Sequence, residues 1–149
     1  MERLAQAIAV LSKKEAFECL QGGVPAAAIA TYEQQLGLTF PDNYRWFLST
    51  FGYVSWFGHS ILGYSPHDPD YDTLVATKRS RATKLPKGFL PLPRNGNIVM
   101  RYGGGGDYVL FSKGGELEGQ VVLYTDEYGG RPTDSWSSFE AFVEHFSRF

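Results

Sequence analysis

The sequence predicts an α+β fold in which N-terminal helices pack on a central antiparallel β-sheet and a C-terminal helix closes the structure. Three observations lead to this prediction. Helical periodicity dominates the first third of the 149-residue chain, short β-type segments separated by glycines follow, and a last helical pattern ends the sequence. Helices and strands that occur in separate runs are typical of the α+β class. The whole length is expected to form a single domain, residues 1–149.

The strongest helix signal lies in residues 41–51. Pro41 suits the first position of a helix, and Gly52 can adopt the left-handed conformation that ends one. Between them, four apolar residues recur at helical spacing and form one stripe: Tyr44, Phe47, Leu48 and Phe51. The pattern predicts a helix with one face in the core.

Three more helices are predicted before this one. Residues 2–11 place their apolar side chains on one face. Ser12-Lys13-Lys14-Glu15 has the pattern of a capping box, which predicts a second helix that ends at Gly22-Gly23 and contains Ala16, Phe17, Cys19 and Leu20. Pro25 opens a third helix, which ends at Gly37.

The periodicity changes after Tyr53. Residues 56–64 are aromatic and interrupted by glycine, which favours a short hairpin or a bulged strand. Residues 71–82 are predicted to be helical, because acidic residues precede them and basic residues end them. The prolines that follow exclude further helix: Pro86, Pro91 and Pro93.

Three strands and a helix are predicted for the remainder. The strands lie at residues 98–102, 108–111 and 120–124, and the glycine-rich turns between them favour antiparallel hairpins. Asp134 or Ser135 is expected to cap the last helix, whose buried side chains are Trp136, Phe139, Phe142, Val143 and Phe146.

Composition excludes several classes of protein. Hydrophobic residues make up 43% of the chain, so a folded core is expected rather than disorder. The single cysteine, Cys19, excludes an internal disulfide and a thiol metal cluster and fits a reducing, cytoplasmic location. The N-terminal residues do not resemble a signal peptide, and no apolar run approaches the ~20 residues of a membrane helix.

Four short motifs occur in an order that resembles the SUKH superfamily. The first comprises Leu36-Gly37, Phe40-Pro41, Tyr44, Phe47-Leu48 and Gly52, and the others are residues 106–110, 119–122 and 138–142. The superfamily includes bacterial immunity proteins and fungal regulators of cell-wall glucan synthesis. The resemblance runs from about Ile29 to the C-terminus, with departures at residues 51–53, where Asn-Gly-Gly is usual, and at Tyr124-Thr125.

This resemblance implies a non-catalytic protein-binding module, foremost an immunity protein that binds and neutralises a cognate toxin. From the residues themselves, we expect no cofactor, no metal and no membrane partner. A regulatory adaptor in cell-wall or glucan synthesis is the alternative within the family. A small hydrolase that uses a carboxylate pair or His59 is the alternative outside it. The oligomeric state is left open.

Three motifs suggest chemistry, and each lacks an essential residue. Residues 58–63 surround Ser60 with glycines, but the glycine that a nucleophile elbow requires two residues later is Leu62. The acidic run 68–72 lacks the glycine and glutamate of a calcium-binding loop. The four glycines at 103–106 precede Asp107 instead of the Lys-Ser/Thr of a phosphate-binding loop.

Charge is distributed unevenly along the chain. The interval between Asp72 and Asp107 holds no acidic residue, whereas seven basic residues lie in it: Lys78, Arg79, Arg81, Lys84, Lys87, Arg94 and Arg101. This predicts a basic face that steers an acidic partner; the alternative is a solvated helix end followed by a loop. The net charge of −2 does not favour nucleic acid.

Aromatic residues next to glycines suggest anchors for a protein partner. Tyr53 and Tyr128 lie in expected turns, and Trp56 belongs to the aromatic segment that follows Tyr53. The predicted partner-binding residues are therefore Tyr53, Trp56, Lys78, Arg79, Arg81, Lys84, Lys87 and Tyr128.

Overall fold

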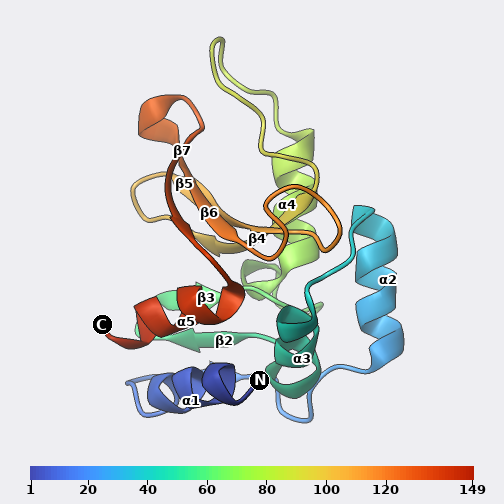
Figure 1. The fold of residues 1–149 in the computed structure, drawn as a ribbon, viewed down its shortest axis with the longest axis vertical. Coiled ribbons are helices and arrows are strands. Elements are labelled where there is room, and N and C mark those ends of the chain that lie inside the picture. The colour runs from blue at the N-terminus through green and yellow to red at the C-terminus, as the bar shows by residue number, and fades with distance from the viewer.

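The computed structural model describes residues 1–149 and confirms the α+β class (Figure 1). The elements, in chain order, are α1 (Glu2–Leu11), β1 (Glu18–Cys19), α2 (Ala26–Leu36), α3 (Asp42–Phe51), β2 (Val54–Trp56), β3 (His59–Ile61), the 3₁₀ helix η1 (Pro69–Tyr71), α4 (Thr73–Ala82), β4 (Gly96–Arg101), β5 (Gly106–Phe111), β6 (Val121–Thr125), the 3₁₀ helix η2 (Asp126–Tyr128), β7 (Arg131–Trp136) and α5 (Phe139–Ser147).

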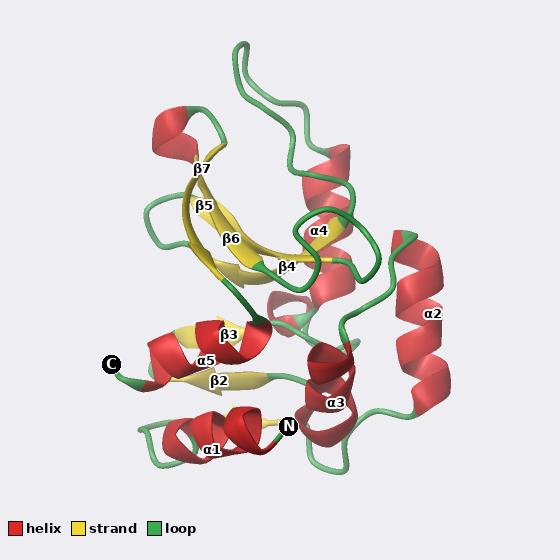
Figure 2. Cartoon of the chain, viewed as in Figure 1, coloured by secondary structure: helices red, strands yellow, loops and turns green.

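The strands form two antiparallel sheets instead of one continuous sheet. One sheet has the order β1-β2-β3 and the other β4-β5-β6-β7 (Figure 2). The sheets meet where the Leu62 N–H, just after β3, donates to the Val99 carbonyl of β4 at 2.7 Å. Beyond this contact β3 and β4 are not paired, so each is the edge strand of its own sheet.

The main core lies between the helices and one face of the sheets. The predicted stripe of α3 is confirmed for Tyr44, Phe47 and Leu48, which are fully buried, while Phe51 is half-buried. The ring of Phe139 from α5 lies 5.1 Å from that of Tyr44, in an edge-on arrangement that aromatic pairs favour.

The opposite face of the larger sheet buries a smaller cluster. Alternation along β5 and β6 directs four side chains to this face: Val109, Phe111, Val122 and Tyr124. Leu92, from the long connection between α4 and β4, packs against them. This connection, residues 83–95, therefore helps to cover the outer face of the sheet, while its tip projects beyond the body of the chain (Figure 1).

The predicted helix after Ser12 is wrong. Residues 12–17 form turns, in which Ala16 has a φ of 60°, and β1 follows. Cys19 pairs with Val54 of β2, and the Leu20 N–H donates to the Phe51 carbonyl at 2.9 Å. This pairing with the edge of β2 outweighs the local helical preference of a segment too short to form a stable helix alone.

The predicted start of the last helix is also wrong. Residues 131–136 form β7, and α5 starts at Phe139 with Ser138 as its cap, since the Ser138 Oγ accepts a hydrogen bond from the Ala141 N–H at 3.0 Å. β7 is almost entirely exposed, so it lacks the apolar alternation by which strands are recognised. The side chain of Trp136, predicted to be buried, is half-buried and packs on Phe142.

A completely buried carboxylate connects several elements. Asp72 caps α4, where its Oδ1 accepts a hydrogen bond from the Val75 N–H at 2.9 Å. Its Oδ2 accepts one from the Ser65 N–H at 2.9 Å and another from the Tyr32 hydroxyl of α2. Burial raises the pKa of Tyr32 well above its usual range, and the hydrogen bond to Asp72 adds a smaller effect in the same direction.

Threonines of α4 complete the edge of β4. The Thr73 Oγ1 donates to the Ile98 carbonyl at 2.6 Å, and the Thr77 Oγ1 accepts from the Ile98 N–H at 3.0 Å. The Asn97 amide also donates to the Thr73 Oγ1 at 2.9 Å. The helix thus satisfies backbone groups that an edge strand would otherwise leave unpaired.

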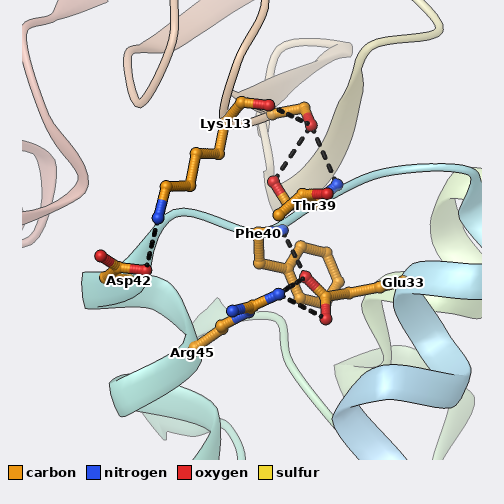
Figure 3. A network of polar contacts seen from close by, with 7 residues as sticks. Glu33, Thr39, Phe40, Asp42, Arg45 and Lys113 are labelled. Atoms are coloured by element: carbon orange, nitrogen blue, oxygen red, sulfur yellow. Dashed lines mark hydrogen bonds and ion pairs between the residues drawn. The ribbon is translucent and has the colours of Figure 1, made fainter.

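A second polar network attaches the α2–α3 connection to the end of β5 (Figure 3). The Glu33 carboxylate accepts hydrogen bonds from the Phe40 N–H at 2.7 Å and from the Arg45 guanidinium at 2.8 Å. On the other side, the Lys113 N–H donates to the Thr39 carbonyl at 2.8 Å, and its ammonium group contacts Asp42 at 3.1 Å. The network holds α3 in register with the larger sheet.

Asp72→Ala is expected to lower the free energy of unfolding by about 3 kcal/mol, because it removes a helix cap and leaves the buried Tyr32 hydroxyl and Ser65 N–H without acceptors. Urea unfolding followed by circular dichroism measures the change. Asp68→Ala is the matched control, since Asp68 caps only η1, and about 1 kcal/mol or less is expected for it. Equal losses for the two variants would contradict the assigned role of Asp72.

Candidate binding surface

The predicted partner-binding residues of α4 lie on different sides of the helix. Thr73, Ala76 and Thr77 face the core, so Lys78 and Arg79 point to solvent. The Lys78 ammonium group donates to the Gln35 Oε1 of α2 at 2.7 Å. The exposed basic groups of this helix are therefore Lys78 and Arg79.

Arg81 lies between α2 and the 83–95 loop, where it makes internal contacts. Its guanidinium donates to the Leu36 carbonyl at 3.0 Å and to the Arg94 carbonyl at 2.9 Å. Burial, and secondarily the charge of Arg94, lower the pKa of Arg81 from its usual value. The side chain thus connects the end of α2 to the base of the loop, a role that its basic character alone did not suggest.

The 83–95 loop carries the next two predicted residues, Lys84 and Lys87, both exposed. The Leu90 N–H donates to the Gly129 carbonyl at 2.9 Å, which fixes the loop against the turn after β6. At Gly130 a side chain would not fit, because a Cβ atom would lie 2.7 Å from the Leu90 carbonyl oxygen. Loop and turn are therefore in close backbone contact.

This contact brings Tyr128 to the same end of the molecule as the two lysines. Tyr128 is 58% exposed on η2, and Leu90 is 51% exposed in the loop. We call this region the loop–turn surface and define it as Lys84, Leu85, Lys87, Leu90 and Tyr128. The sequence pattern did not single out Leu85 and Leu90, although each is an apolar residue before a proline in a segment without periodicity.

The basic interval does not form one continuous patch. Arg81 is used internally, and the Arg101 guanidinium contacts the Asp107 carboxylate at 3.3 Å. Asp126 and Glu127 are exposed next to Tyr128. Burial raises the pKa of Asp107, Arg101 acts in the opposite direction, and Asp126 raises it further. The loop–turn surface is thus apolar with lysines, and acidic side chains lie at its border.

The two remaining predicted residues lie elsewhere. The ring of Tyr53 is stacked on that of Tyr71, with centroids 4.8 Å apart, and Tyr53 is half-buried. Trp56 is only 2% exposed and belongs to the main core, which leaves it almost no surface for the predicted contact with a partner. As the last residue of β2, its side chain faces the helices that cover the sheet.

The motifs that suggested chemistry occupy structural positions. Asp68 caps η1 and Asp72 caps α4. Three of the glycines at 103–106 lie in the turn between β4 and β5, and the fourth, Gly106, begins β5. His59, Ser60 and Asp70 line one cleft, but no hydrogen bond joins their side chains, and the His59 ring packs on Trp56 at 5.6 Å. A serine nucleophile needs a base within hydrogen-bonding distance, which this arrangement does not supply.

These features define an α+β protein with a projecting loop that carries exposed apolar and basic side chains. A family model described as SMI1-KNR4 cell-wall, SUKH_5, matches residues 4–148. The chain belongs to this SUKH family, and the match extends to α1, which the sequence motifs had not included. No curated protein matches the chain. None of its helices has the length and apolar character needed to cross a membrane.

Arg81→Met is expected to lower the free energy of unfolding by about 2 kcal/mol, because it removes two charge-assisted hydrogen bonds. Faster amide exchange in residues 83–95 is expected as well, since the base of the loop loses its attachment. Hydrogen exchange and urea unfolding measure both effects. Arg79→Met serves as the control, because Arg79 is exposed on the same helix, and a change within about 0.5 kcal/mol is expected for it. If the two variants behave alike, Arg81 is not a structural connection.

Proposed function

We propose that this protein is an immunity protein of the SUKH family that binds a cognate toxin and neutralises it by covering the toxin's active cleft. The observation that carries the proposal is the loop–turn surface, where the backbone contact between Leu90 and Gly129 joins the loop that carries exposed Leu90, Lys84 and Lys87 to the turn that carries exposed Tyr128. Membership of the SUKH family supports a non-catalytic module, and the resemblance to immunity proteins supplies the toxin as the partner.

The chemistry of this surface suits an acidic protein partner. Tyrosine and leucine bury apolar area at the centre of a contact, and tyrosine is enriched among residues that dominate binding energy. Lysines at the border accelerate association with an acidic surface, and that effect weakens as salt increases. Lys78 and Arg79, on the exposed side of α4, extend the positive charge towards the loop. The free Cys19 supports a cytoplasmic site of action.

A regulatory adaptor in cell-wall or glucan synthesis is the second candidate. The description of the matching family, SMI1-KNR4 cell-wall, favours it. An adaptor would use the same kind of surface without neutralising a toxin. The growth of cells that express the toxin therefore distinguishes the two functions. If this protein restores the growth of cells that express a toxin encoded next to its own gene, the result supports neutralisation. Altered wall glucan without any rescue supports the adaptor.

The toxin identified by the rescue experiment serves as the ligand. Replacement of both Lys84 and Lys87 by Glu is expected to lower its affinity about tenfold at low salt and to remove most of the dependence of that affinity on salt concentration. Tyr128→Ala is expected to weaken binding about tenfold through lost apolar contact. Titration calorimetry at two salt concentrations measures both effects.

The matched control reverses the same number of charges elsewhere. Lys13→Glu combined with Arg148→Glu alters two exposed residues remote in sequence from the loop–turn surface, and unchanged affinity is expected. If the loop variant and the control bind the toxin equally, the loop–turn surface is not the binding site.

A further inference from the structure

A cleft opens where the two sheets separate. It encloses about 340 Å³ between β3 and β4, within the range of ~300–1,000 Å³ that ligand pockets typically occupy. Buried Leu62 and Met100 form its apolar floor, and Ser60 and Arg101 lie on opposite walls. The cleft is closed at one end by the hydrogen bond between Leu62 and Val99.

The backbone of Ser60 has no partner in its own sheet. β2 and β3 are joined by the two-residue turn Phe57-Gly58, so Trp56 and His59 form the hydrogen-bonded pair next to the turn. The following pair, Ser55 and Ser60, is then the non-hydrogen-bonded type. The Ser60 N–H and carbonyl therefore point away from β2, in the same direction as the Leu62 N–H that reaches β4.

The same reasoning applies to the opposite wall. The Tyr102 N–H donates to the Gly106 carbonyl at 3.1 Å, so the preceding pair, Arg101 and Asp107, is not hydrogen-bonded through the backbone. The Arg101 N–H and carbonyl thus point away from β5. No backbone hydrogen bond outside the strand ladders involves Ser60 or Arg101. Each wall consequently offers one free donor and one free acceptor.

Two exposed aromatic residues are adjacent in sequence to glycines that line the cleft. Phe57 precedes Gly58 and is 68% exposed, and Tyr102 precedes Gly103 and is 39% exposed; both glycines line the cleft. Phe57 also has a φ of +40°, in a turn position that favours asparagine or glycine. A strained backbone that exposes a large apolar side chain lowers stability, and such residues concentrate at functional sites.

We infer that this cleft binds a short extended peptide segment of a partner protein. The peptide backbone pairs with Ser60 and Arg101, an apolar side chain lies on Leu62 and Met100, and neighbouring side chains contact Phe57 and Tyr102. The Arg101 side chain is 55% exposed despite its contact with Asp107, so an acidic residue in the peptide is complementary to it. This is recognition by β-strand addition, in which backbone hydrogen bonds supply affinity and side-chain pockets supply specificity.

Selection from a random dodecapeptide display library on the full chain tests the inference. Enriched peptides are expected to alternate apolar and polar residues and to contain an acidic residue. Their affinity is then measured by fluorescence polarisation. Methylation of single backbone nitrogens, one position at a time along a selected peptide, should weaken binding about tenfold at two positions of opposite parity, where the N–H groups face Ser60 and Arg101, because these hydrogen bonds are lost, and should have little effect at positions outside the cleft.

Two pairs of protein variants complete the test. Ser60→Pro removes the free N–H at a position where an edge strand tolerates proline, and about tenfold weaker binding is expected, whereas Ser60→Ala keeps the N–H and should bind normally. Phe57→Asn should raise the melting temperature by about 2–4 °C, since it relieves the turn, yet weaken binding about fivefold. The control Phe149→Ala removes another exposed phenylalanine and should leave affinity unchanged.

The inference is overturned if no peptide is enriched, or if the selected peptides are insensitive both to Ser60→Pro and to backbone methylation. Since methylation changes only the peptide, this result does not depend on how Ser60→Pro folds. The inference does not rest on the loop–turn surface. Reversal of Lys84 and Lys87 should leave peptide affinity unchanged, so failure of the proposed function and failure of this inference are distinguishable.

Discussion

The buried carboxylate of Asp72 is the constraint on which the rest of this structure depends. A charge removed from water is tolerated only when donors surround it, and here the donors come from α2, from the segment after β3 and from α4 itself. The three elements must therefore occupy one relative arrangement for the chain to fold. Around this charge, Thr73 and Thr77 add the hydrogen bonds that seat α4 on the edge of β4.

Both candidate surfaces are attached to this helix, at its opposite ends. Near its N-terminus, the segment that contains Leu62 and Gly63 runs from the β3–β4 cleft to Asp72, with which Gly63 forms a β-bridge. At its C-terminus, Arg81 holds the base of the 83–95 loop. A helix that is fixed to the sheet can present both the loop–turn surface and the cleft without losing conformational entropy on binding, which favours affinity.

The sequence predicted what depends on local pattern. The helices at 2–11 and 41–51, the hairpin near residue 58 and the three later strands follow from periodicity, prolines and glycines, and the family model confirms the SUKH resemblance. The errors at β1 and β7 have one cause, since both are strands selected by a neighbour's edge rather than by their own apolar alternation. The burial of Trp56 and the internal contacts of Arg81 could not be predicted, because they depend on how distant segments of the chain pack. The cleft depends on backbone direction, which composition does not reveal.

Native-state hydrogen exchange at single amides tests the central claim most directly, namely that one buried charge holds α4, the β3 extension and β4 together. The amides of Ser65, Val75 and Ile98 donate to Asp72 or to Thr77, so all three are expected to exchange only through global unfolding, with the same free energy and the same denaturant dependence. Exchange of these amides through separate local openings of lower free energy would contradict the account, because the helix and the strands would then be stabilised independently.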